Sequence, residues 1–204
     1  KEWIKYFVKE PEGCVYFTMV DPAIEIGKKN DYTAIVTCAV DNAENIYIVD
    51  YINKRMLPRE TISAIFDMYS RWNSAVIGIE TVGFMKMLKN EFDNECSRRR
   101  EYPIVVDLKS AGRRKALRIE ALQPRFERGT IHLKEKMEEM ETQLLRFPSP
   151  RCHDDLIDAL AYILDIIRPA KKQANNINPN SFLGVFENYR EKIKGPEYWG
   201  NHNI

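Results

Sequence analysis

Three apolar runs follow one another in the first quarter of the chain. Residues 15–21, 32–40 and 46–52 are rich in β-branched, aromatic and aliphatic side chains. Pro22 ends the first run, because proline cannot continue a central strand. The connections between the runs are short, and short connections favour antiparallel neighbours. The sequence therefore predicts three strands that form an antiparallel meander.

After residue 57 the hydrophobic period changes to that of helices. Apolar residues recur at helical spacing, beginning with Ile62, Ile65 and Phe66. Pro58 stands at the entrance of this segment, a position that suits proline at the start of a helix. Helical and strand patterns then alternate. The predicted helices are 58–72, 84–96, 115–128, 136–145 and 154–167, and the predicted strands are 74–80, 104–108 and an edge strand at 130–133.

Alternating strands and helices favour parallel pairing through right-handed crossovers. We therefore expect an α/β fold with a mixed five-stranded sheet, three antiparallel strands followed by parallel ones, flanked by helices on both faces. The domain is predicted to span residues 15–168. Residues 1–14 are interpreted as the remnant of a linker, because the chain starts at Lys1 rather than at methionine. The polar, Asn-rich residues 169–204 are interpreted as a tail with room for one short docking helix.

Composition narrows the class of protein without indicating an activity. The 204 residues include 31 basic and 30 acidic side chains, so net charge argues neither for nor against a polyanionic partner. The four cysteines lack the CxxC spacing of zinc sites, which favours reduced thiols and a reducing cytoplasm. No apolar run reaches the roughly 18–20 residues of a membrane-spanning helix, so we expect no membrane segment.

Two adjacent carboxylates, Asp154 and Asp155, stand at the start of an apolar helical pattern. Adjacent anions repel each other unless a positive group compensates them. A helix N-terminus stabilises a charge by roughly 0.3–1 kcal/mol, and a divalent cation compensates far more. One interpretation is that Asp154 only caps the helix, which is a common role for aspartate. The other is that the pair binds a metal ion.

Other lone acids strengthen the metal interpretation. Asp21 and Glu80 each end a predicted strand, and the two strands are expected to be parallel neighbours, so both acids leave the sheet at one edge. A helix that starts at Asp154 and packs across the first strand would bring the pair to the same point. Asp158 lies one helical turn beyond Asp154 on the same face, as a further ligand or an orienting group.

Clusters of carboxylate oxygens suit Mg²⁺ or Mn²⁺. Two such ions, about 3.5–4 Å apart, activate a water and stabilise the leaving oxygen in phosphodiester cleavage. The sequence therefore predicts a site for two Mg²⁺ or Mn²⁺ ions.

Basic residues cluster after the strand at 104–108. Phosphate contacts from such a group give affinity that is independent of sequence and falls with salt. Lys115 has an alternative role, that of bracing the metal site, and the run 98–100 is interpreted as a solvated helix end. The predicted DNA-binding residues are Lys109, Arg113, Arg114, Lys115 and Arg118.

An ordered set of short motifs resembles the C-terminal nuclease domain of viral large terminases, the genome-packaging motors of tailed phages. The resemblance covers about residues 15–168. The motifs are Val20-Asp21-Pro22-Ala23, Lys29-Asn30-Asp31-Tyr32-Thr33-Ala34-Ile35, Ile79-Glu80-Thr81, Lys115 at the start of a helix, Phe147-Pro148, and the run from His153 through Asp154, Asp155 and Asp158 to Tyr162.

The resemblance implies an RNase H-like endonuclease that cleaves concatemeric double-stranded DNA with divalent metal ions. It gives the metal-ligand and catalytic roles to Asp21, Glu80, Asp154 and Asp155. It also implies as partners the ATPase domain of the same large terminase, the portal and the small terminase subunit, in the cytoplasm of the infected host cell. The ATPase half would need a Gly-x-x-x-x-Gly-Lys-Ser/Thr loop, and this sequence contains none.

Two alternatives remain open on the sequence. An RNase H-like junction resolvase or transposase relative would keep the fold and prefer branched DNA. A docking module of the packaging motor without catalytic activity would need no metal. The collected acids count against the second alternative, because a docking module has no reason to gather them.

Overall fold

A seven-stranded mixed sheet organises the part of the chain that the structure describes. The computed structural model describes residues 2–23, 32–80, 84–108, 114–149 and 151–167, and of residues 84–87 only the backbone. The strands are β1 (Lys5–Phe7), β2 (Val15–Asp21), β3 (Thr33–Val40), β4 (Ile46–Lys54), β5 (Val76–Glu80), β6 (Val105–Leu108) and β7 (Ile131–Lys134). The helices are α1 (Pro58–Trp72), α2 (Phe84–Arg99), α3 (Lys115–Glu120), α4 (Gln123–Glu127), α5 (Glu138–Arg146), α6 (Asp155–Ala161) and α7 (Ile163–Ile166).

The strand order is β1-β7-β4-β3-β2-β5-β6. The meander β2–β3–β4 is antiparallel, and β5 and β6 extend it with parallel pairing on the side of β2, as predicted. The fold class is confirmed, but the strand count is not, because the sheet has seven strands rather than five. The predicted edge strand, β7, is in fact an inner strand that pairs in parallel with both β4 and β1.

Strand β1 comes from the segment that we expected to be a linker. It pairs with β7 from Lys5↔His132 to Phe7↔Lys134, and the Phe7 ring packs edge-on against Tyr47 at 5.3 Å. A three-residue strand is too short to show an alternating pattern in the sequence. Strand β1 contributes to the tertiary structure, because it supplies hydrogen-bond partners to β7, which would otherwise be an open edge of the sheet.

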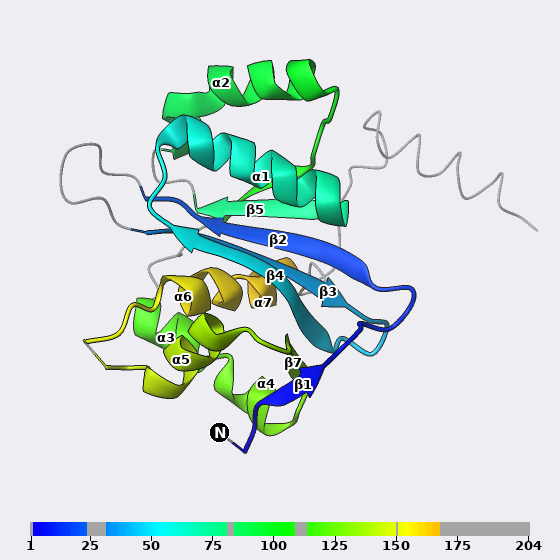
Figure 1. Cartoon of the computed structure of the whole chain (residues 1–204), viewed down its shortest axis with the longest axis vertical. Helices are drawn as coiled ribbons and strands as arrows, with labels where there is room; N and C mark the ends of the chain where they lie inside the picture. The colour runs from blue at the N-terminus through cyan, green and yellow to red at the C-terminus, as the bar shows by residue number, and fades with distance from the viewer. Residues whose placement is uncertain (1, 24–31, 81–83, 109–113, 150, 168–204) are drawn as a thin grey trace, which may run out of the picture. The chain divides into compact units, whose positions relative to one another are not determined.

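Helices cover both faces of the sheet, as predicted. Helices α1 and α2 lie on one face, and α3 to α7 lie on the other (Figure 1). All eight residues of β3 are buried, because this central strand is covered on both sides. Its side chains alternate between the two layers: Val36 belongs to the core under α6, and Ile35 belongs to the core under α1.

Two predicted helices are each divided in two. The segment 115–128 forms α3 and α4, because Pro124 lacks the N–H that a continuous helix needs and instead lies in the first turn of α4. The segment 154–167 forms α6 and α7, with the junction at Tyr162, whose N–H donates to the Ala159 carbonyl at 3.3 Å. None of the described helices is long and apolar enough to cross a membrane.

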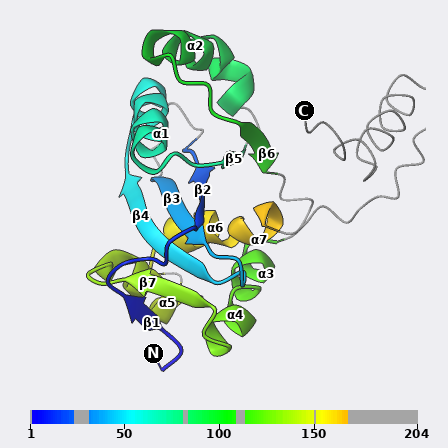
Figure 2. The ribbon, with the colours of Figure 1, turned by 90° about the vertical axis from the view of Figure 1, so that its right-hand side faces the viewer.

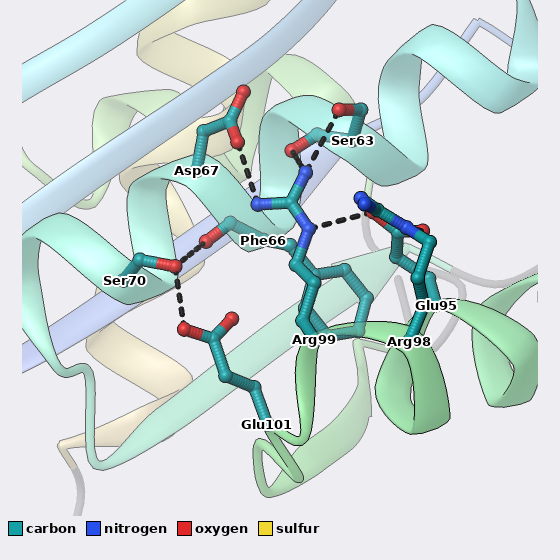
Figure 3. A network of polar contacts seen from close by, with 8 residues as sticks. All are labelled: Ser63, Phe66, Asp67, Ser70, Glu95, Arg98, Arg99 and Glu101. Carbon is teal, nitrogen blue, oxygen red and sulfur yellow. Dashed lines mark hydrogen bonds and ion pairs between the residues drawn. The ribbon is translucent and has the colours of Figure 1, made fainter.

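The end of α2 is fixed to α1 by Arg99 (Figure 3). Its guanidinium donates to Glu95 at 2.6 Å, to Asp67 at 2.6 Å and to the Ser63 hydroxyl at 2.9 Å, and it lies over the Phe66 ring. Arg98 stays exposed, and within the described residues its ion pair is with Glu95 on its own helix. The interpretation of 98–100 as a solvated helix end therefore fits Arg98 but not Arg99.

Candidate metal centre

Two acids lie side by side at one edge of the sheet. Asp21 is the last residue of β2 and Glu80 the last of β5, and the parallel register pairs Val20 with Ile79 immediately before them. The Ala23 N–H then donates to the Thr33 hydroxyl at 3.1 Å, which ties the chain that leaves β2 to β3. The predicted placement of both acids at a common edge is what the structure shows.

The third acid of the cluster is Asp158. One oxygen from each of Asp21, Glu80 and Asp158 lies within 4.8 Å of the other two. Helix α6 carries Asp158 and packs across β2 and β3. Asp158 is only 3% exposed, so its carboxylate approaches the strand ends from within the core layer.

The adjacent pair Asp154 and Asp155 lies outside this tight group. The Lys115 ammonium is 2.8 Å from Asp154 Oδ1, 3.7 Å from Asp155 Oδ1 and 3.4 Å from Asp158 Oδ2. Asp155 is near enough for its charge to contribute to the raised pKa of Asp21. Of the four acids expected to converge, Asp21 and Glu80 form a tight group with Asp158, and Lys115 connects Asp154 and Asp155 to that group.

The capping interpretation of Asp154 does not describe the structure. Asp154 precedes α6, but its side chain makes no capping hydrogen bond. The buried Gln143 of α5 caps the helix instead, since its Oε1 accepts the Leu156 N–H at 3.0 Å. The carboxylates at the start of α6 are therefore not needed to cap the N-terminus of the helix.

The electrostatics of the cluster favour the binding of a cation. Burial, followed by the charges of Glu80 and Asp158, raises the pKa of Asp21 to about 8. Burial also raises the pKa of Asp158, although Lys115 and Arg118 oppose the shift. Converging carboxylates that hold a proton near neutral pH favour a divalent cation in the proton's place. The cluster contains only oxygen donors, which suits Mg²⁺ or Mn²⁺.

Arg118 is not placed to meet DNA. It is 5% exposed, and its Nε and a terminal nitrogen lie 2.8 Å and 2.6 Å from Asp158 Oδ1. Its guanidinium also stacks over the Tyr162 ring at 4.2 Å. Arg118 thus braces Asp158 from behind, where α3 packs beside α6 (Figure 2).

The other predicted DNA-binding residues differ in their surroundings. Lys115 is partly exposed and contacts three aspartates, and their charges outweigh burial and raise its pKa. That geometry fits the alternative role of bracing the site. Arg114 is exposed at the start of α3. Lys109 and Arg113 lie outside the described residues.

Tyr162 closes the last family motif, but no role at the site was assigned to it from the sequence. Its hydroxyl is buried and makes no hydrogen bond of ordinary geometry within the described part of the chain. Burial and the neighbouring Glu80 carboxylate raise its pKa. Its signals in the sequence were its place in that motif and its position one helical turn after Asp158, and aromatic residues are common at such positions in apolar helices.

A family model matches the part of the chain that carries these acids. The family described as "Terminase RNaseH-like domain" matches residues 18–165, which include all the acids discussed above. No curated protein sequence matches the chain.

Solved structures share the fold at low identity. The large terminase nuclease from thermophilic phage G20c has 16% identity and a TM-score of 0.54, over 79% of this chain and 94% of that chain. The human cytomegalovirus terminase nuclease domain has 14% identity and a TM-score of 0.52, over 75% of this chain and 82% of that chain. The HK97 bacteriophage large terminase has 7% identity and a TM-score of 0.55, over 78% of this chain but 40% of that chain.

These findings confirm the predicted resemblance and the RNase H-like fold. The chain belongs to the family of terminase RNase H-like domains.

Proposed function

We propose that this domain is the endonuclease of a phage large terminase, which cuts concatemeric double-stranded DNA with two bound Mg²⁺ or Mn²⁺ ions and little sequence preference. The observation that carries the proposal is the convergence of Asp21, Glu80 and Asp158 within 4.8 Å at one edge of the sheet. The human cytomegalovirus terminase nuclease domain, which shares this fold, was soaked with manganese.

Each acid has a distinct role in the proposal. Asp21, Glu80 and Asp158 would hold metal, and Asp155, whose charge acts on Asp21, would contribute beside them. When bound, the ions activate a water and stabilise the leaving oxygen of the phosphodiester. Asp154 mainly positions Lys115, whose ammonium lies 2.8 Å from Asp154 Oδ1.

The cations of the site control its charge. Arg118 balances the buried Asp158 and fixes its orientation through two nitrogen contacts to one oxygen. Lys115 is partly exposed and reduces the repulsion between the aspartates and an approaching phosphate. Arg114, one residue earlier, is exposed and offers its charge to the DNA backbone.

The wider setting follows from the family. The ATPase domain of the same large terminase, the portal and the small terminase subunit are the proposed partners, in the cytoplasm of the infected cell. In the HK97 large terminase, the likeness to this chain covers 40% of the length, which leaves room there for other domains.

The test is plasmid cleavage by wild type and Asp21→Asn, with Mg²⁺, Mn²⁺ or chelator. We expect wild type to nick and linearise the plasmid only with metal, and Asp21→Asn to lose this activity while its circular dichroism spectrum stays unchanged. The matched control is Asp93→Asn, which removes an exposed carboxylate on α2 and should cleave normally. Cleavage by Asp21→Asn at the wild-type rate would remove Asp21 from the site.

Two other outcomes would change the proposal. Cleavage confined to branched DNA would favour the junction-resolvase alternative. A wild-type protein that cuts nothing with either metal, while folded, would favour the docking module.

A further inference from the structure

A second arginine–tyrosine pair lies at the edge of the sheet that carries the metal centre. The Arg55 guanidinium stands over the Tyr32 ring at 5.2 Å. The His153 imidazole lies 5.0 Å from the same ring, tilted by 49°. We call these three residues the Arg55 strip. They come from the end of β4, the start of β3 and the residues before α6, so tertiary folding alone brings them together.

The hydrogen-bonding capacity of the strip is unused within the described residues. Arg55 is exposed and makes no ion pair or hydrogen bond to any of them. Its neighbours Lys54 and Arg59 are also exposed and likewise form no ion pair in the described part of the chain. His153 has 69% of its side chain exposed, and its Nδ1 is 3.7 Å from Asp155. The strip therefore presents N–H donors to the solvent next to an acidic cluster.

The sheet places the strip on one flank of the acids. In the order β4-β3-β2-β5-β6, Arg55 follows β4, Tyr32 precedes β3, Asp21 ends β2 and Glu80 ends β5. Strand β4 is two strands from β2, a distance of about 10 Å, or about three base-pair rises along one DNA strand. Arg114 immediately precedes α3, which follows β6, the strand at the other end of this order.

We propose that the Arg55 strip binds the phosphate backbone of the DNA substrate a few nucleotides from the cleaved bond, on the flank of the acids opposite to Arg114. This inference rests on the proposed nuclease function and adds a binding site to it. The substrate would thus be held on both sides of the carboxylates, which themselves repel phosphate.

The aromatic contact explains why Arg55 suits this role. A free arginine side chain loses rotamer entropy when it binds a phosphate. A guanidinium that already rests on a ring loses less, and its planar donors stay free for the two oxygens of a phosphate. Tyr32 is partly buried, and the chain holds it between β3 and the residues before α6, so the ring is a stable support.

The test measures DNA binding by fluorescence anisotropy, with two duplexes of unrelated sequence, in Ca²⁺ and over a range of salt concentrations. Arg55→Ala should weaken binding to both duplexes by about tenfold, the effect of one charged hydrogen-bond contact. It should also make the slope of log affinity against log salt shallower by about 0.9. Tyr32→Phe, which keeps the ring, should bind like wild type, and Tyr32→Ala should bind nearly as weakly as Arg55→Ala.

The matched control is Arg128→Ala. Arg128 is an exposed arginine before β7, at the sheet edge opposite to the acids. It carries the same charge and should change affinity by less than about twofold. Thermal unfolding of each variant verifies the fold, and Arg55→Lys, which keeps the charge without the planar fork, should fall between wild type and Arg55→Ala.

Equal affinity and equal salt slope for Arg55→Ala and Arg128→Ala would overturn the inference. Wild-type binding by Tyr32→Ala would also overturn it, since the ring would then not support the guanidinium. Cleavage is scored separately. If the wild type cleaves DNA and the Arg55→Ala variant binds DNA normally, the inference about the Arg55 strip is rejected and the proposed nuclease function stands. If the wild type never cleaves DNA but Arg55→Ala weakens DNA binding, the inference about the Arg55 strip stands and the proposed nuclease function is rejected.

Discussion

Two arginine–tyrosine pairs flank the same acids and serve different purposes. Arg118 stacks on Tyr162 at 4.2 Å and is 5% exposed, and it contacts Asp158 through two nitrogens. Arg55 stacks on Tyr32 at 5.2 Å, is exposed, and has no hydrogen-bond partner among the described residues. The chemistry of the two pairs is alike, and only burial and the use of the donors differ.

This difference in exposure separates an arginine that supports a site carboxylate from one that is free to bind a ligand. A buried guanidinium must be paired, because an unpaired charge in the core is strongly unfavourable. Arg118 is therefore committed to Asp158 and cannot serve an incoming phosphate. An exposed guanidinium has no such requirement, and the ring beneath it restricts its motion without occupying its donors. Exposure thus decides which of two similar pairs is free to bind a ligand.

The largest expected effect comes from breaking the buried pair. Arg118→Ala leaves Asp158 buried without its main partner, and we expect the free energy of unfolding to fall by about 3 kcal/mol. The effect should lie at the low end for such pairs because Lys115 remains 3.4 Å from Asp158. Urea denaturation measures it.

The control for this change is the exposed ion pair of Arg71 with Asp50, in which the arginine side chain is 61% exposed. Arg71→Ala should cost at most about 1 kcal/mol. Equal losses for the two variants would contradict the assignment of Arg118 as a buried support.

The next effect concerns the acid that the buried pair supports. Asp158→Asn should lower Mn²⁺ affinity and the cleavage rate by at least about 100-fold, because the carboxylate belongs to the tight cluster. Asp154→Asn should lower both by less than about tenfold, because Asp154 mainly contacts Lys115. Titration calorimetry with Mn²⁺ and plasmid cleavage measure these changes. A larger loss for Asp154→Asn than for Asp158→Asn would instead assign the catalytic role to the pair Asp154 and Asp155.

The pH dependence of metal binding gives a smaller but graded effect. The pKa of Asp21 is raised to about 8, so below that pH the metal-free protein holds a proton that a metal ion must displace. Metal affinity should therefore rise with pH, by up to about tenfold per unit, and become level above about pH 8. Calorimetry between pH 6 and pH 9, at roughly unit steps across this range, tests it.

The same shift has the opposite sign for folding of the metal-free protein. A raised carboxyl pKa means that the folded state binds the proton more tightly than the unfolded state. Its contribution to stability is complete below the unfolded value of about 3.9 and is lost as pH rises through about 8. Asp21→Asn should flatten this part of the stability profile. A profile that rises over the same range in both proteins would contradict the shift.

The smallest expected effect is that of Tyr162→Phe. The ring remains under Arg118, and the removed hydroxyl makes no hydrogen bond in the described structure, so stability should change by less than about 1 kcal/mol. Mn²⁺ affinity should fall by about threefold, because the dipole of the neighbouring hydroxyl acts on the Glu80 carboxylate. An unchanged affinity would limit Tyr162 to its ring contact with Arg118.

Much of the site could be read from the order of apolar runs. Asp21 and Glu80 each follow a strand pattern, and parallel neighbours bring such residues to one edge, so their proximity follows from local sequence and topology. Asp158 was less certain, because 154, 155 and 158 fall within one helical turn. Helical spacing fixes the angle at which a side chain leaves the helix, but not the depth at which the helix packs on the sheet.

The sequence by itself determined the α/β class, the meander, the strand-end acids and the family motifs, because these depend on residues close together in the chain. Tertiary structure alone decided that Arg118 turns inward while Arg55 stays exposed, that Gln143 caps α6, and that β1 completes the sheet. Each of these outcomes depends on a partner distant in sequence or on burial. The hydrophobic period along one segment contains neither, because it specifies a face and not the neighbour that covers it.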